Sequence, residues 1–309
     1  MFFIVILAFC VIIDDSGFCV ESRREGMSSE KTGLVLEGGG MRGIYTAGVL
    51  DVFMENGICF DGVLGVSAGA IHGCSYVAGQ KGRNIRYYKK YCKDKRFMSF
   101  RNFLLTGSIV GEQFCYHELP ERLEVFDYQA FLQSPMEFYV GCSNVETGKA
   151  EYLRLTDMKE EIDLLRASAS LPYVSKIVHA KGMKLLDGGC TDSIPVRAFR
   201  DMGFTKTVVV LTQHKGYVKK PENNVISKFF YRKYPAFTEA VRKRPETYNR
   251  TIKDIEAWEQ AGEIFVIRPT APLEVERTKS NPDELQKAYD AGRNDALEKL
   301  DAMTEWMKK

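Results

Sequence analysis

The sequence has no cluster of metal-binding residues and no excess of charge of one sign. Its eight cysteines include no Cys-x-x-Cys pair, and neither they nor the four histidines show metal-ligand spacing. The formal net charge is only +2, so no overall field favours nucleic acid. We therefore expect no metal site, no nucleic-acid partner, and scattered reduced thiols of the kind found in cytoplasmic proteins.

Long hydrophobic runs and internal repeats are also missing. The apolar stretch over residues 1–13 is too short to span a bilayer as a helix. It has the character of a signal-peptide core, but no Lys or Arg precedes it and the region around Cys19 is a poor cleavage site. Because Met27 lies just before the first convincing strand, we expect residues 1–26 to be an over-extended start. The alternative is a genuine segment for secretion or membrane targeting.

The most informative stretch present is Phe60 to Gly79. An apolar run meets Ser67, which Gly65 and Gly69 flank in a Gly-x-Ser-x-Gly pattern, and a helix-compatible segment over 68–78 follows. This predicts a strand, a sharp turn and a helix, with the serine hydroxyl exposed at the head of the helix, where negative charge is favoured. The alternative is a strand-to-helix turn packed with small residues.

A second strand, glycine loop and helix precedes this unit. Residues 32–37 are a short apolar run, Gly38 to Gly43 read GGGMRG, and 44–56 has helical periodicity. The loop matches a dinucleotide-binding pattern only weakly, and Arg42-Gly43 stands where a Walker loop needs Gly-Lys. Backbone N–H groups with one fixed cation beside a serine are the composition of an oxyanion hole.

Asp187 is the candidate base. Strands are predicted over 137–144, 150–155, 174–178 and 183–186, with a helix over 159–169, and the last strand delivers Asp187-Gly188-Gly189 at its end. Aspartate before two glycines is commonly a turn. Strand ends in an open α/β sheet converge on one edge, however, so this carboxylate can meet Ser67 and the glycine loop.

Four ordered motifs resemble those of patatin-like phospholipases, in the bacterial branch of that family. They are GGGMRG (38–43), GVSAG (65–69), ASASLP (167–172) and DGG (187–189). The resemblance implies an α/β fold with a mainly parallel central sheet, helices on both faces and a helical C-terminal extension. It also implies ester hydrolysis of a phospholipid-like or other lipid substrate, without a cofactor.

The resemblance assigns roles to residues of this chain. It places the nucleophile at Ser67 and the base at Asp187, without a catalytic histidine, and the oxyanion loop at Gly38, Gly39, Gly40 and Arg42. The glycines that support these motifs are Gly43, Gly65, Gly69, Gly188 and Gly189. We expect a catalytic domain over 27–212 and an extension over 213–309 that packs on it.

The histidines leave one alternative open. His72 should point away from Ser67, and His179 precedes a turn, whereas His214 follows a predicted strand over 207–211. The chain order Ser67, Asp187, His214 is that of an α/β-hydrolase triad, so a triad stays a minority hypothesis.

Two basic and aromatic segments have no assigned role. Residues 82–100 and 215–250 interleave Lys and Arg with Tyr and Phe, which is typical of solvated helices but also of surfaces that meet anionic lipid. The second segment could form a flap at a membrane. After a strand over 262–268, residues 282–307 are predicted as a helix. Its expected buried stripe comprises Leu285, Ala288, Ala291, Ala296, Leu297 and Leu300.

Two other functions remain open at this point. The scaffold could bind acyl chains or anionic head groups without turnover, with the Ser67 turn kept for structure. Nucleotide binding through the glycine loop is the weakest alternative.

Overall fold

One mixed sheet organises the part of the chain that the structure describes. This structure is a computed structural model, and it describes residues 30–221, 225–275 and 281–309, so the expectations for residues 1–26 lie outside it. The strands are β1 Thr32–Leu36, β2 Gly62–Val66, β3 Glu137–Asn144, β4 Ala150–Arg154, β5 Val178–Ala180, β6 Met183–Asp187, β7 Lys206–Val210 and β8 Ile264–Ile267. They lie in the order β5-β6-β3-β2-β1-β7-β8, and β4 also pairs with β3. The five strands from β3 to β8 in this order are parallel.

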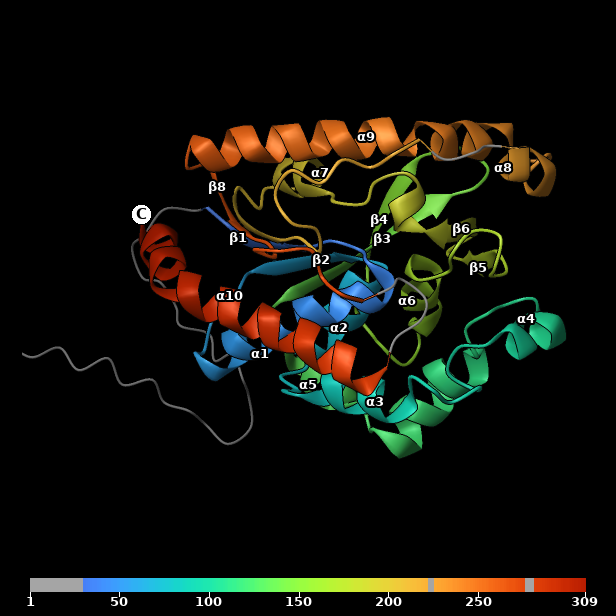
Figure 1. The fold of residues 1–309 in the computed structure, drawn as a ribbon, viewed down its shortest axis with the longest axis horizontal. Helices are drawn as coiled ribbons and strands as arrows, with labels where there is room; N and C mark the ends of the chain where they lie inside the picture. The colour runs from blue at the N-terminus through green and yellow to red at the C-terminus, as the bar shows by residue number, and fades with distance from the viewer. Residues whose placement is uncertain (1–29, 222–224, 276–280) are drawn as a thin grey trace, which may run out of the picture.

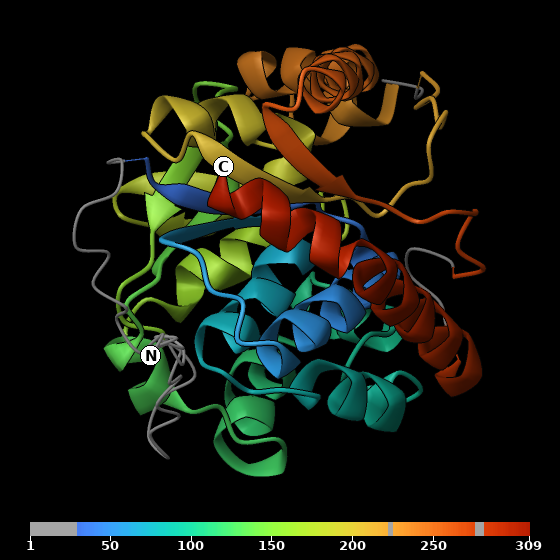
Figure 2. The same cartoon turned by 90° about the vertical axis from the view of Figure 1, so that its left-hand side faces the viewer.

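Helices cover both faces of the sheet. They are α1 Ile44–Glu55, α2 Ala68–Val77, α3 Arg83–Tyr91, α4 Phe100–Thr106, α5 Tyr128–Gln133, α6 Ile162–Ser168, α7 Val196–Asp201, α8 Val225–Phe230, α9 Pro235–Gln260 and α10 Pro282–Lys308. Figures 1 and 2 show α7 and α9 on one face, and α1, α2 and α10 on the other. The predicted α/β fold with a mainly parallel sheet and a helical C-terminal part is confirmed. None of the helices in the described residues is long and apolar enough to cross a membrane.

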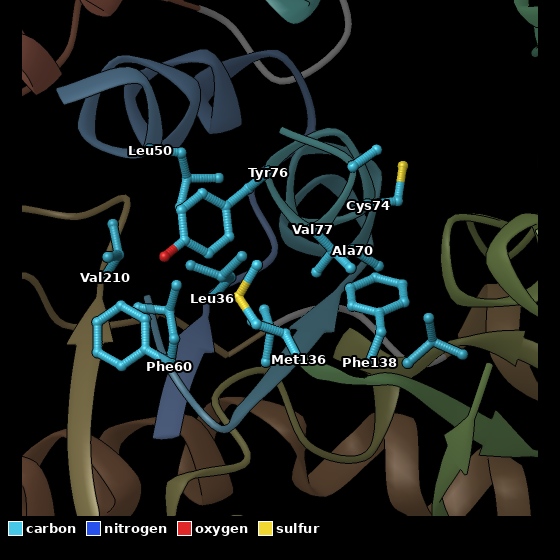
Figure 3. Packing of buried hydrophobic residues seen from close by; sticks show 14 of the residues in the cluster. Leu36, Leu50, Phe60, Ala70, Cys74, Tyr76, Val77, Met136, Phe138 and Val210 are labelled. Carbon is cyan, nitrogen blue, oxygen red and sulfur yellow. The ribbon is translucent and has the colours of Figure 1, made fainter. Parts of the chain in front are cut away.

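The core beneath α1 and α2 fixes the first two strands. Every residue of β1 and β2 is buried, as expected for parallel strands that are covered on both faces. Figure 3 shows Leu50 of α1 and Tyr76 of α2 above Leu36 of β1, and Ala70 of α2 above Phe138 of β3. Each of these side chains is at most 2% exposed. This packing holds in place the carboxyl ends of β1 and β2, where the glycine loop and Ser67 follow.

The last helix, α10, is built into the same body. A Cβ added at Gly48 of α1 would lie 2.1 Å from the Tyr289 carbonyl oxygen, and one at Gly292 would lie 2.0 Å from that of Tyr45. The Tyr45 hydroxyl also donates to the buried Asp295 carboxylate at 2.8 Å. The two helices therefore approach at backbone contact, which only glycine permits at these two positions.

The predicted buried stripe of α10 is wrong at one residue. Leu297 is 49% exposed, whereas Leu285, Ala288 and Ala296 are buried as expected. The close approach of Gly292 to α1 sets the rotation of the helix. It turns Asp295 and Met303 inward in place of Leu297.

The segment before β5 differs from the sequence prediction. Residues 174–177 form no strand, and β5 begins only at Val178. Tyr173 adopts a φ of 70°, and the Val174 carbonyl accepts a hydrogen bond from the Ile109 amide at 2.7 Å. A loop that pairs with the chain near α4 thus replaces the expected strand.

Reduced thiols were expected throughout, and this is wrong at one position. The free cysteines of the described chain are Cys74, Cys92, Cys115, Cys142 and Cys190. Cys59, in contrast, takes part in a disulfide bond.

Candidate active site

Ser67 occupies a strained turn between β2 and α2. Its φ of 55° and ψ of −122° are unusual for a residue with a side chain. A Cβ at Gly65 would lie 2.5 Å from Ala70, and one at Gly69 would lie 2.4 Å from the Leu36 carbonyl oxygen. The two glycines therefore let α2 fold back against the sheet, and the strained turn presents the hydroxyl of Ser67 at the start of the helix.

The carboxylate of Asp187 lies directly against this hydroxyl. Ser67 Oγ donates to Asp187 Oδ2 at 2.6 Å, and the Gly189 amide donates to Oδ1 at 2.7 Å. Ser67 is 7% and Asp187 4% exposed. A Cβ at Gly188 would lie 2.2 Å from the Gly141 carbonyl oxygen, so the DGG turn sits tightly on β3. The ends of β2 and β6 therefore meet as the sequence predicted, although β6 runs antiparallel to β3, which separates it from β2.

The ASASLP segment (167–172) is hydrogen-bonded to the backbone of Ser67 and of Asp187. Ser168 Oγ accepts a hydrogen bond from the Ser67 amide at 3.0 Å and donates one to the Gly141 carbonyl at 2.7 Å. The Asp187 amide in turn donates to the Ser170 carbonyl at 2.9 Å. The end of α6 thereby fixes the backbone of both Ser67 and Asp187.

The glycine loop packs on the other side of Ser67. A Cβ at Gly38 would lie 3.0 Å from Ser67 Cβ, and Gly40 takes a φ of 59°, which a side chain disfavours. In the described part of the chain, the amides of Gly38 and Gly39 donate to no backbone carbonyl. Gly43 lies at the head of α1, where a Cβ would be 2.6 Å from that of Ala68. Backbone amides next to a serine, like those of Gly38 and Gly39, can stabilise a developing oxyanion.

A buried carboxylate that sequence reasoning missed anchors this loop. Glu37 is 2% exposed, and its two carboxylate oxygens accept hydrogen bonds from the Thr212 amide at 2.6 Å and from the Tyr248 hydroxyl at 2.8 Å. Burial, and next the charge of Glu37, raise the pKa of Tyr248 far above its usual range. Tyr248 belongs to α9, so the C-terminal part of the chain holds the glycine loop in place.

An apolar cavity of about 130 Å³ opens beside Ser67. Ala68, Ile71 and Cys74 line it at successive turns of α2, so it follows that helix for about 9 Å. The opposite wall comes from α3, α6 and the residues between α4 and α5, and includes Tyr88 and Tyr116. The sequence indicates a solvated or lipid-facing segment over residues 82–100, but the structure buries part of it in this wall. Tyr87, Tyr88 and Tyr91, whose side chains are buried, recur at helical spacing, and this spacing is the sequence signal for the wall.

A polar pocket lies on the other side of the serine. Arg42, Lys219 and Arg244 line it together with Ser67 and Asp187. Lys219 Nζ lies 4.3 Å from the centre of the Tyr248 ring. Ser67 is therefore placed between an apolar cavity and a polar pocket whose walls include three cations and the carboxylates of Glu37 and Asp187. An amphiphilic ester suits this arrangement.

His72 and His214 have partners other than Ser67 and Asp187. His72 is fully buried in α2 with its ring 5.3 Å from that of Tyr88, and His214 is half-buried with its Nδ1 2.8 Å from the Lys215 carbonyl oxygen. His117 and His179 are on other segments, at the 114–123 π-helical turn and in β5. Within the described residues, no group of three or more His, Cys, Asp and Glu is arranged to hold a metal ion.

His72 gives a prediction about stability. Desolvation lowers the pKa of its ring from 6.5 to about 4, opposed in part by Asn84. The unfolded chain binds a proton below pH 6.5, whereas the folded chain binds it only near pH 4, so stability that is present above pH 6.5 is lost as the pH falls. We expect this group to contribute about 3 kcal/mol to the fall in the free energy of unfolding over that range.

Urea denaturation of wild type and His72→Phe at several pH values measures this contribution. Because phenylalanine does not titrate, the variant should lose less stability than wild type on acidification, whatever its stability at neutral pH. Equal pH dependence of the two proteins would contradict a buried neutral imidazole.

Two family models match this chain. The model of the patatin-like phospholipase family matches residues 34–200, and that of a domain of unknown function, DUF6363, matches residues 234–308. The second region includes Arg244 and Tyr248, which reach the site from α9.

Relatives in other organisms match the same region. An uncharacterized protein of Escherichia coli, YjjU, is 33% identical over 182 residues, which are 58% of this chain and 50% of that protein. The lysophospholipase NTE1 of Lodderomyces elongisporus is 27% identical over 184 residues, which are 57% of this chain and 12% of that protein. This chain thus spans half or less of the length of these two relatives.

One solved structure is also similar, the crystal structure of VipD from Legionella pneumophila. It has a TM-score of 0.45 and 14% sequence identity, and the match covers 89% of this chain and 68% of that one. The family model alone matches more than half of this chain, from β1 through α7. The chain therefore belongs to the patatin-like phospholipase family.

Proposed function

We propose that this protein is a serine-dependent lipid acyl hydrolase that cleaves a carboxylic ester of a phospholipid or a similar lipid. The observation that carries the proposal is the 2.6 Å hydrogen bond from Ser67 Oγ to Asp187 Oδ2 beside an apolar cavity. A nucleophile and a base within hydrogen-bond reach are the requirement for covalent ester hydrolysis. Membership of the patatin-like family and the lysophospholipases among the relatives support the same class.

In the first half of the proposed reaction, Asp187 accepts the proton of Ser67 as Oγ attacks the ester carbonyl carbon. The carbonyl oxygen becomes an oxyanion, which the amides of Gly38 to Gly40 and the cation of Arg42 stabilise. When the tetrahedral intermediate collapses, the carbon–oxygen bond to the alcohol breaks and Asp187 returns its proton to the alcohol. Ser67 then carries the acyl group as an ester.

In the second half, water replaces the alcohol. Asp187 accepts a proton from the water as its oxygen attacks the acyl carbon, and the same amides hold the second oxyanion. Collapse of this intermediate releases the fatty acid and returns the proton to Ser67 Oγ. Each step uses Asp187 alone as acid and base, as expected of a Ser–Asp dyad.

The two pockets suggest how the substrate would lie. The acyl chain would occupy the apolar cavity along α2, and the polar side of Ser67 would take the rest of the lipid. Arg42 has the planar fork that suits a phosphate, and Lys219 and Arg244 line the same pocket. A lipid ester is held in a bilayer or micelle, so the proposal includes peripheral contact with a membrane.

The cavity also favours a second candidate function, acyl-chain binding without turnover. In that case, the Ser67 turn would be kept only for structure. Both candidates predict lipid binding, and only the first predicts an activated serine.

Reaction with a fluorophosphonate ester tests the proposed function, because this reagent traps an activated serine in a covalent bond. We expect one adduct by intact-mass spectrometry in wild type, mapped to Ser67, and none in Ser67→Ala. The matched control is Ser75→Ala, which removes another buried hydroxyl from α2 and should still be labelled. A folded wild-type protein that takes up no label would favour acyl-chain binding without turnover.

A further inference from the structure

Two short helices expose large apolar side chains. On α4, Phe100, Leu104 and Leu105 are 66%, 69% and 67% exposed. On α8, Ile226, Phe229 and Phe230 are 54%, 72% and 55% exposed. Isolated exposed leucines are common on protein surfaces, but three on each of two short helices are not, and such groups mark interaction sites.

The two helices lie on one side of the molecule, with the loop of residues 173–176 between them. A Cβ added at Gly107, which ends α4, would lie 3.2 Å from the Lys176 side chain, and the Ile109 amide donates to the Val174 carbonyl at 2.7 Å. On the other side of the loop, the ring centre of Tyr173 lies 5.9 Å from that of Phe230. Figure 1 shows α4 and α8 at the same edge, far from the C-terminus. We call α4, this loop and α8 the docking face.

The docking face continues the wall of the apolar cavity. Phe97 and Met98, just before α4, line the cavity, and so does Val110 just after it. Met98 and Val110 pair in an isolated β-bridge. Helix α4 therefore lies in a loop that begins and ends at the cavity wall. The exposed side chains of α4 are thus only a few residues away from the cavity beside Ser67.

The docking face itself carries cations and no carboxylate. Arg101 of α4, Lys176 of the loop and Lys228 of α8 are exposed, and these three segments contain no aspartate or glutamate. Two more exposed cations, Arg232 and Lys233, follow α8. One carboxylate lies beside the face: Glu112 lines a small pocket with Lys176 and pairs with Arg166 at 3.1 Å. Apolar side chains set among cations are the pattern of a segment that lies in the interface of an anionic membrane.

We propose that the docking face inserts into the surface of an anionic lipid bilayer and brings the apolar cavity to the membrane. The apolar side chains of α4 and α8 would enter the boundary between head groups and acyl chains, while the five cations contact lipid phosphates. This inference rests on the proposed function for its purpose, since a lipid ester would pass from the bilayer into the cavity. Its test needs no turnover.

The test measures binding to vesicles in the Ser67→Ala background, which removes hydrolysis. Vesicles of phosphatidylcholine with phosphatidylglycerol should bind the protein, and phosphatidylcholine alone should bind it less. The double variant Leu104→Ser/Phe229→Ser should lower the partition coefficient by at least about tenfold in a flotation assay. Raising the salt from about 0.1 M to about 0.5 M should weaken binding of the parent through screening.

A matched control and a fold check accompany this assay. Leu297→Ser removes an apolar side chain that is 49% exposed on α10, outside the docking face, and should bind vesicles as the parent does. Thermal melting should be similar in all three proteins, because none of the replaced side chains is buried. If the double variant binds vesicles as well as the parent, the proposal is wrong.

Two further outcomes separate this proposal from others. Light scattering that shows a parent dimer, which the double variant dissociates, would assign the face to a second copy and overturn the membrane role. With Ser67 restored, the double variant should hydrolyse a soluble short-chain ester at the wild-type rate and vesicle lipid more slowly. If wild type hydrolyses neither substrate yet binds vesicles through this face, the proposed function fails and the docking face stands.

Discussion

Asp187→Asn is expected to lower kcat for ester hydrolysis by about 10³-fold or more, because an amide cannot accept the proton of Ser67. The side chain keeps its shape, so its oxygen can still accept the hydrogen bond that the Gly189 amide donates to Oδ1 in wild type. The nitrogen in place of Oδ2 would instead face Ser67 Oγ, which donates to the carboxylate at 2.6 Å. Steady-state hydrolysis of a soluble short-chain ester measures the loss, and Ser67→Ala should lose at least as much.

Asp192→Asn is the matched control for this experiment. Asp192 is another aspartate carboxylate just after β6. It accepts hydrogen bonds from the Tyr152 hydroxyl at 2.8 Å and the Ile194 amide at 3.2 Å. Its replacement shows how far kcat falls when a nearby carboxylate other than that of Asp187 is removed. We expect most of the activity to persist. Comparable hydrolysis by Asp187→Asn and wild type would rule out Asp187 as the base.

The same assay decides between the dyad and the triad. The dyad predicts that His214→Ala keeps its activity, because the His214 ring is directed to the Lys215 carbonyl. A loss in His214→Ala as large as that in Asp187→Asn would favour the triad.

The sequence predicted the site where local rules decide the structure. The apolar run before Ser67 and the small residues around it define a strand-to-helix turn without reference to the rest of the chain. Asp187 is different, because β6 is separated from β2 by β3 and runs antiparallel to β3. Its carboxylate reaches Ser67 because β6 pairs only with residues 142–144 of β3, so that Asp187 lies opposite Cys142, one residue beyond the Val66–Gly141 pair. The convergence of strand ends thus indicated this pair of residues, but the offset of β6 that joins them is set by the tertiary fold.

The rest of the site depends on packing between distant segments. Nothing near Tyr248 in the sequence indicates that its hydroxyl will meet Glu37, which lies 211 positions earlier. Leu297 fits the helical stripe of α10 but is exposed, because backbone contact at Gly48 and Gly292 fixes the helix rotation. Such contacts are set by the tertiary fold, and a periodicity within one element does not contain them.

The apolar cavity beside Ser67 is likewise formed only by the tertiary fold. Its walls come from α2, α3, α6 and the segment between α4 and α5, which no single motif joins. Ile71 lies one turn after Ser67 on α2 and lines the cavity beside the serine. We expect Ile71→Trp to fill this space and lower kcat/KM for long-chain lipid esters by about 100-fold.

A short-chain ester separates a blocked cavity from a damaged site. Its acyl group needs little of the cavity, so Ile71→Trp should hydrolyse it at nearly the wild-type rate, and a small fluorophosphonate should still label Ser67. Ile252→Trp places the same side chain at a half-buried isoleucine of α9, away from the cavity, and should leave both activities in place. Equal losses on short and long esters would mean that the variant disturbs Ser67 itself. No loss on either would place the acyl chain elsewhere, because a tryptophan at Ile71 and an extended chain along α2 cannot occupy the same space.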